Sequence, residues 1–208
     1  MRAPSKTVLK AGGYVKGVAI ALVTQNKDPD GLCRVKVRYP WHDKPRESYW
    51  ARLAMPMAGK DRGLVLIPEV DDEVLVGFER GDLRFPYVLG ALWNGAEKPP
   101  IANKDGKNDK RILKSRKKHY LLFDDGDRGV VELAHENGAV IRFTDDEIVL
   151  KDRQGNQLRV TSETGTMTIE SNGQLSIKAA TITIEASGAL TVKAGATLSM
   201  RGAQVNIN

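Results

Sequence analysis

Clustered acidic residues are the side chains of this sequence that most resemble catalytic groups. They lie in 71–73 (DDE), in 124–127 (DDGD) and in 145–147 (DDE). Paired carboxylates hydrolyse glycosidic bonds when their environments differ and when they flank a substrate cleft. Each cluster here falls at a strand end or turn, where Asp stabilises the local backbone. The pattern therefore favours solvated turn residues over a catalytic pair.

Histidine and cysteine offer no better candidates. His42, His119 and His135 stand far apart and lack a metal-binding spacing such as HxH or HExxH. The sequence contains no P-loop, no GxSxG and no GxGxxG. The single cysteine, Cys33, excludes an intrachain disulfide, and its place in a strand-like run favours a buried structural thiol. We therefore expect a protein that is not an enzyme, with no catalytic, cofactor-binding or metal-binding residues.

Composition and charge limit the remaining function classes. The 208 residues are 41% hydrophobic, and no run approaches the roughly 18 apolar residues of a membrane span. The start of the chain has no apolar segment typical of a signal peptide, so we expect assembly in the cytoplasm. The net charge is +6, but 98–118 alone holds nine basic and two acidic residues. The positive charge is thus local, and that segment is either a junction contacting acidic neighbours or a solvated linker.

The elements that must position any site are predicted to be strands. Six short strand-like runs and their turn signals within about eighty residues indicate a small barrel of the oligonucleotide/oligosaccharide-binding (OB) type. Within one run, Cys33, Val35 and Val37 alternate with basic residues, which predicts one buried face. The predicted domains are an extension (1–13), an OB barrel (14–96), a Pro- and charge-rich linker (97–111) and a second β region (112–208). The six candidate strands are 14–24, 31–40, 49–56, 64–68, 72–79 and 87–93.

The second β region begins as hairpins and ends as a repeat. Asn137-Gly138 and Gly155-Asn156 are turn signals between alternating runs. From Met167 onward, units of seven or eight residues each carry two apolar residues two positions apart, without any aromatic residue or proline. An extended unit of about five residues spans about 17 Å, which is too short for a full coil of a one-chain β-helix. A free-standing meander would leave its apolar face in water.

Three identical chains wound about one axis would resolve this difficulty, because each unit could then form one side of a triangular prism. We therefore expect an all-β protein, in which the OB barrel precedes an intertwined triple-stranded β-helix of a homotrimer. The alternative is a disordered or aggregating tail, which would need neither strict alternation nor regular glycines and charges. The residues expected to point to the trimer axis are Met167, Ile169, Leu175, Ile177, Ile182, Ile184, Leu190, Val192, Leu198 and Met200.

Residues 35–100 resemble a known family almost throughout. The sequence is similar to the spike proteins of contractile injection systems, such as phage baseplate assembly protein V and the valine-glycine repeat spike protein of type VI secretion. Residues 119–125 (HYLLFDD) resemble the family's junction into its β-helix. The matching barrel motifs are 38–41 (RYPW), 50–52 (WAR), 68–70 (PEV), 72–76 (DEVLV), Phe78, 81–82 (GD) and 86–95 (PYVLGALWNG).

The resemblance implies a structural spike that seats on a hub or baseplate protein at its N-terminal side. Sheath contraction would then push the needle mechanically through a target membrane. It would place the protein in a phage baseplate or in a secreted injection particle. The family's short phage spikes often end in histidines, which are missing here after His135; the end formed by Val205, Ile207 and Asn208 is therefore expected to carry a separate PAAR-type tip protein.

The family's larger spikes carry an N-terminal hub domain, for which 1–13 is too short, so a separate hub protein is expected. An alternative function is an OB module that binds an oligonucleotide or oligosaccharide and carries a flexible tail. Nucleic acid is not expected as a partner, because the basic residues cluster outside the barrel and the tryptophans fall where the family has them.

Overall fold

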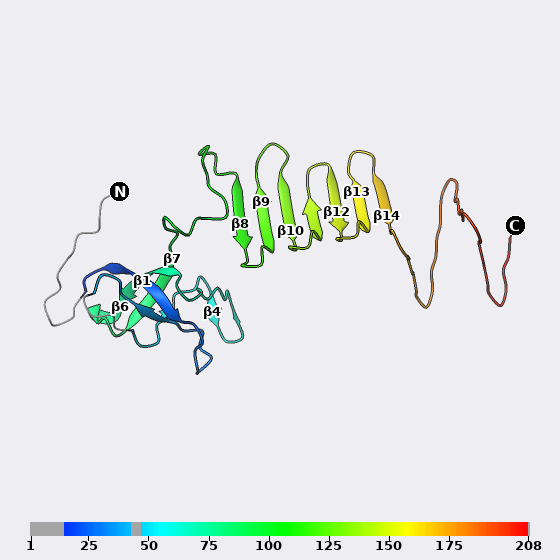
Figure 1. The fold of residues 1–208 in the computed structure, drawn as a ribbon. Coiled ribbons are helices and arrows are strands. Elements are labelled where there is room, and N and C mark those ends of the chain that lie inside the picture. The colour runs from blue at the N-terminus through cyan, green and yellow to red at the C-terminus, as the bar shows by residue number, and fades with distance from the viewer. Residues whose placement is uncertain (1–14, 43–46, 208) are drawn as a thin grey trace. The chain divides into compact units, whose positions relative to one another are not determined.

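The computed structural model describes residues 15–42 and 47–207, and the predicted extension 1–13 lies outside them. The chain divides into two compact units, Met1–Lys104 and Asp105–Asn208. Both units are built from strands (Figure 1). Within the described part, the one helical element is a short 3-10 turn, η1 (Glu79–Gly81). The predicted all-β class is therefore confirmed.

The first unit contains a five-stranded sheet with the order β2-β1-β6-β7-β3. Its neighbouring strands are antiparallel except for β3 and β7, which are parallel. A separate two-residue hairpin pairs β4 with β5. The strands of the unit are β1 (Val18–Gln25), β2 (Lys36–Arg38), β3 (Arg52–Leu53), β4 (Ala58–Gly59), β5 (Arg62–Gly63), β6 (Glu73–Phe78) and β7 (Pro86–Ala91).

Alternating residues of these strands form the hydrophobic core of the first unit. Val74 and Val76 of β6 are fully buried, as the period of two in a strand with one inward face requires. The hydroxyl of Tyr39 donates to the Leu83 carbonyl oxygen at 2.8 Å, and burial raises the pKa of this tyrosine. The core comprises Ala21, Val23, Val35, Val37, Tyr39, Ala51, Val74, Val76 and Val88.

Two details of the predicted barrel are wrong. Residues 64–68 form no strand, and four of these five residues are exposed, because the chain runs there as an extended connection from β5 toward β6. Cys33 is exposed instead of buried. Its backbone has φ +55°, so the alternation of the run begins only at Val35, where an isolated bridge to Ala51 starts the pairing.

The turn before Cys33 explains this break in the pattern. The Asp28 carboxylate accepts hydrogen bonds from the backbone N–H groups of Leu32 and Arg34, at 3.1 and 3.2 Å. The Arg34 guanidinium also pairs with it at 2.7 Å, and this contact holds the pKa of Asp28 well below its usual range. The loop thus folds around one buried carboxylate and leaves the Cys33 side chain outside.

The second unit contains one seven-stranded antiparallel meander, in which every strand pairs with the next (Figure 1). The predicted turns at Asn137-Gly138 and Gly155-Asn156 lie between successive strands, and Gly138 has φ +92°, which favours glycine. The strands are β8 (Lys110–Lys114), β9 (Tyr120–Asp124), β10 (Val130–Ala134), β11 (Val140–Phe143), β12 (Glu147–Lys151), β13 (Gln157–Thr161) and β14 (Thr166–Glu170).

The repeat continues beyond this sheet without strand partners in the single chain. After β14, the described residues 171–207 form no strand. They run as a series of extended segments and bends (Figure 1). The predicted triple-stranded β-helix therefore stays a prediction for this part of the chain.

Candidate functional site

The most distinctive surface of the protein is one face of the seven-stranded sheet. The pairing register places two rows of side chains on this face, because residues opposite each other in an antiparallel pair point to the same side. With one exception, Arg111, both rows are apolar. We call it the apolar face, and its apolar members are Leu113, Leu121, Phe123, Val131, Leu133, Ile141, Phe143, Ile148, Leu150, Leu158, Val160, Met167 and Ile169.

The apolar face is open to solvent in the single chain. Leu133 and Leu150, from two strands near its centre, are 54% and 51% exposed. In the described part of the second unit, Val149 is the one buried apolar residue, and it lies on the opposite face. A face of this size without a cover is unusual, since exposed contiguous apolar patches on soluble monomers mark interaction sites.

The opposite face of the sheet, which we call the polar face, carries the charged side chains of the strands beside apolar ones such as Ile112, Leu122 and Val149, and several of its charged groups pair within the chain. The buried Glu132 carboxylate accepts hydrogen bonds from the Tyr120 hydroxyl and from Nε of Arg142. The bond to Glu132 raises the pKa of Tyr120. Further along the sheet, Arg159 forms an ion pair with Glu147. This face therefore needs no partner, which distinguishes it from the apolar face.

The predicted axis residues extend the apolar pattern past the sheet. Met167 and Ile169 lie on β14 and belong to the apolar face. The other eight, from Leu175 to Met200, fall in the segment without strands, and each is more than half exposed. Of the predicted tip residues, Val205 and Ile207 are also exposed, and Asn208 lies outside the described residues. The assignment of these residues to a trimer axis and a tip stays a prediction.

The acidic clusters lie in turns and at strand ends. The Asp72 carboxylate accepts the backbone N–H of Glu69 at 2.8 Å, which closes the turn before β6. Asp124 forms an ion pair with Lys110 at 3.4 Å, and Asp125 pairs with Arg111. These partners are what turn residues and strand ends require.

The fold brings two histidines together, which the sequence did not predict. The rings of His119 and His135 lie 4.2 Å apart between centroids, at neighbouring ends of β9 and β10. Their Nδ1 atoms accept the backbone N–H groups of Glu136 and Asn137, both at 3.2 Å. No group of three metal-ligating side chains occurs among the residues that the structure describes. The pairing follows from the hairpin register, which the spacing in sequence does not reveal.

Two of the three barrel tryptophans have structural contacts. Nε1–H of Trp41 donates to the Ile20 carbonyl oxygen at 2.8 Å. The Trp50 ring lies under the Lys36 ammonium, 5.2 Å from the ring centroid. Trp93 is 69% exposed at the end of the barrel segment. A stacking platform for nucleic acid bases would need several free aromatic faces in a basic groove, and these contacts do not favour one.

As for membrane contact, the described residues include no helix with the length and apolar character needed to span a bilayer.

Comparison with known proteins identifies the first unit. The family model of the type VI secretion system/phage-baseplate injector OB domain matches residues 19–93. This match runs from the second residue of β1 to just beyond β7 and confirms the predicted OB fold.

Several VgrG proteins are similar to part of the chain. VgrG2a of Pseudomonas aeruginosa, a type VI secretion system spike protein, is 37% identical over 78 residues, which are 36% of this chain and 9% of the relative. VgrG3 of Vibrio cholerae, also a spike protein, is 33% identical over 109 residues, which are 49% of this chain and 11% of the relative. The actin cross-linking toxin VgrG1 of Vibrio cholerae is 29% identical over 109 residues, 49% of this chain and 10% of the relative.

The chain spans about a tenth of the length of these relatives. Two of these three relatives are named as spike proteins. The first unit therefore contains an injector OB domain of the type VI secretion system/phage-baseplate kind, and part of the chain resembles the VgrG spike proteins of type VI secretion.

Proposed function

We propose that this protein is the central spike of a contractile tail or injection machine and that it works as a homotrimer. The observation that carries the proposal is the apolar face of the second unit, which is continuous over seven strands and exposed in the single chain. The similarity to proteins that are named as type VI secretion spikes also supports the proposal. In this proposal, the barrel corresponds to 14–96, the linker to 97–111 and the needle to 112–208.

Burial of the apolar face is the driving force for association. Each apolar side chain of this size gains about 1.5–3 kcal/mol when it moves from water into a packed core. A strand of five residues is about 17 Å long, and this length would form one side of the triangle. Three such sheets can therefore enclose a narrow triangular core with their apolar faces inward. The polar face, with its Glu132 and Glu147 ion pairs, then faces solvent.

The tail needs the other chains even more than the sheet does. Its backbone N–H and C=O groups have no strand partner within the described single chain. Buried backbone groups must form hydrogen bonds, so the tail can bury its apolar pairs only by pairing with neighbouring chains. In the proposed needle, the two apolar residues of each unit, such as Leu190 and Val192, point to the axis, and rungs of three chains follow one another.

The two ends of the needle have different roles in the proposal. On the N-terminal side, the barrel seats on a hub or baseplate protein at the end of the tail tube. At the other end, Val205, Ile207 and Asn208 form a platform for a PAAR-type tip protein. Contraction of the sheath then drives the needle through the target membrane, so the contact with the membrane is mechanical. The protein would act in a phage baseplate or a secreted injection particle.

Light scattering of the purified protein tests the proposal. A species of about three times the 22.8 kDa chain mass is expected, because the apolar face cannot be buried by one chain. The same species should resist detergent until it is boiled, since unfolding a rung requires three chains to separate. A well-behaved monomer would contradict the proposal and leave the barrel as a binding module with an open second unit.

A further inference from the structure

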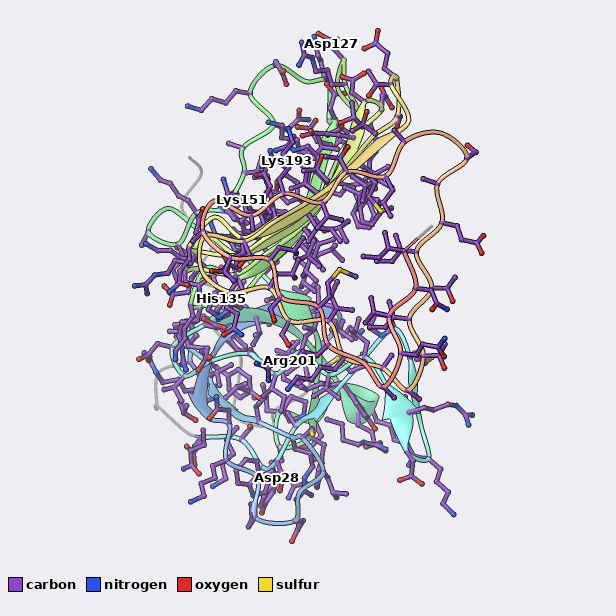
Figure 2. All side chains as sticks on the ribbon, turned by 90° about the vertical axis from the view of Figure 1, so that its right-hand side faces the viewer. Asp28, Asp127, His135, Lys151, Lys193 and Arg201 are labelled. Atoms are coloured by element: carbon purple, nitrogen blue, oxygen red, sulfur yellow. The ribbon has the colours of Figure 1, made fainter. Side chains whose placement is uncertain are left out.

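The turns of the seven-stranded sheet lie alternately at the two ends of its strands. We call these two lines of turns the edges of the sheet. Turns 125–129, 144–146 and 162–165 lie along one edge, because each joins the same ends of successive strands. Turns 115–119, 135–139 and 152–156 lie along the other. Figure 2 shows Asp127 at one end of the strands, and His135 and Lys151 toward the other.

The two edges differ in the sign of their charge. The turns of the first edge hold five acidic residues and one basic residue, Arg128. We call it the acidic edge, and its acidic residues are Asp125, Asp127, Asp145, Asp146 and Glu163. The turns of the second edge hold four basic and two acidic residues. We call it the basic edge, and its basic residues are Arg116, Lys117, Lys118 and Arg153. Among the adjoining strand ends, Lys114 and Lys151 add positive charge and Glu170 adds negative charge.

Contacts within the chain leave this difference in place. On the basic edge, the Asp152 carboxylate is used by its own turn, where it accepts the N–H groups of Gln154 and Asn156 at 2.8 and 2.9 Å. On the acidic edge, Asp125 pairs with Arg111. No hydrogen bond or ion pair within the described residues involves the carboxylates of Asp127, Asp145 and Asp146. The acidic edge is therefore available for positive charge from another molecule.

We propose that the opposite charges of the two edges make copies of this chain associate in parallel, with the acidic edge of one sheet against the basic edge of the next. The partner of each edge is thus a second copy of the same chain. This inference rests on the proposed function, because it assumes that the apolar faces are buried together.

Symmetry explains why the edge charges select the parallel arrangement. When copies are related by rotation about an axis along the stack of strands, each sheet presents one edge to the opposite edge of its neighbour. When two sheets instead face each other in an antiparallel sandwich, with the two-fold axis along the strands, like edges come together. Acidic turns would then meet acidic turns, which is unfavourable. The edges therefore act against a mispaired assembly that the apolar face alone would permit.

Parallel association has a consequence for the molecule as a spike. It gathers all barrels at one end and all tails at the other, so the assembly has a hub end and a tip end. The apolar face contributes most of the association energy but does not encode direction, because apolar contacts are not directional. The edges supply the directional information.

Charge reversal on each edge, alone and combined, tests the proposal in the full chain. The basic-edge variant carries Lys114→Glu, Lys117→Glu and Lys118→Glu, and the acidic-edge variant carries Asp127→Lys, Asp145→Lys and Asp146→Lys. At low ionic strength, each variant should assemble from refolded monomer at least about tenfold more slowly than the wild type, because electrostatic steering is lost. The variant with all six changes restores opposite edges and should assemble at nearly the wild-type rate. It also controls for folding, since it contains every substitution.

A cysteine crosslink reports the direction of the chains. With Cys33→Ser as background, Ile169→Cys places a thiol on the apolar face of the last strand. In a parallel assembly, identical thiols meet and form a disulfide. In an antiparallel sandwich, Ile169 of one copy lies against β8 of the other copy, near Leu113. The two Ile169 positions are then about 29 Å apart along the sheet, which is six strand spacings of about 4.8 Å. Thr168→Cys, on the opposite face, is the matched control and should not crosslink.

The outcomes separate the two proposals. Slower assembly of both single-edge variants with recovery in the combined variant, together with Ile169→Cys crosslinking, is the expected result. A wild-type trimer whose three charge variants all assemble at the wild-type rate would overturn the role of the edges and leave the proposed spike intact. A wild-type protein that stays monomeric would overturn the proposed function, and the edge proposal with it.

Discussion

The two units of this chain solve the burial of apolar residues in different ways. The barrel encloses nine of its apolar side chains in one core. The seven-stranded sheet encloses one, Val149, among its described residues and leaves a whole face of larger side chains in solvent. Both units are made of short, mostly antiparallel strands with similar alternation. The difference therefore comes from closure. In the first unit, a bridge between Val35 and Ala51 joins the runs that lead into the outer strands β2 and β3, whereas the strands of the meander follow one another in a single layer.

Single-layer geometry also changes what a substitution can do. In the barrel, a core side chain acts on the stability of one chain. On the apolar face, a side chain acts on association, because its packing partners belong to other copies in the proposed assembly. The same apolar-to-polar change should thus lower the unfolding free energy in the first unit and change the number of associated chains in the second.

The largest effect is expected from a charge placed on the apolar face. Ile169→Asp would bury an unpaired carboxylate in the proposed core, which costs several kcal/mol per chain. Thr168→Asp, one residue earlier, points to the polar face opposite Arg159 and is the matched control. Light scattering should show loss of the trimer for Ile169→Asp only. Equal behaviour of the two variants would mean that the apolar face is not the association surface.

A cavity in the barrel core should give a smaller effect of the other kind. Val76 is fully buried on β6, so Val76→Ala removes two methyl groups from a closed core and should lower the free energy of barrel unfolding by about 2 kcal/mol. The mass of the assembly should stay unchanged, because this residue belongs to the barrel's own core. Thermal unfolding and light scattering on the same sample measure both quantities. Dissociation of the trimer in this variant would contradict the separation of the two units.

The strands and hairpins of both units could be predicted from the sequence better than the way in which each sheet buries its apolar face. Alternation and turn dipeptides such as Asn137-Gly138 were sufficient for the hairpins, because a two-residue period and a left-handed glycine are local properties. The injector OB domain was recognisable from its motifs. Cys33 and 64–68 were assigned wrongly, since a buried carboxylate, Asp28, reshapes one loop and the other segment is extended without a ladder partner.

Contacts across the sheet could not be predicted from spacing. The His119 and His135 pair, and the carboxylate of Glu132 between Tyr120 and Arg142, join residues 10 to 16 positions apart. Each depends on the register of a hairpin, and a shift by one residue would move these side chains to the other face. The proposed axis and tip residues depend on further chains, so no single-chain property determines them.

The smallest effect is expected on the polar face, where the meander satisfies its own groups. Glu132→Gln leaves an amide oxygen that can replace only one of the two carboxylate oxygens contacted by Tyr120 and Arg142, so the unfolding free energy should fall by about 1 kcal/mol. The bond to Glu132 raises the pKa of Tyr120, so its contribution is complete below the ordinary tyrosine pKa of about 10 and is lost as pH rises through the raised value. The stability deficit of Glu132→Gln should therefore shrink in alkaline solution.

Tyrosinate absorbance, with Tyr120→Phe as the control that identifies the signal, should show the Tyr120 pKa falling in the variant. An unchanged titration would mean that Glu132 does not hold this hydroxyl. The trimer mass should be the same in the wild type, Glu132→Gln and Tyr120→Phe, because the polar face is not the association surface in the proposed assembly.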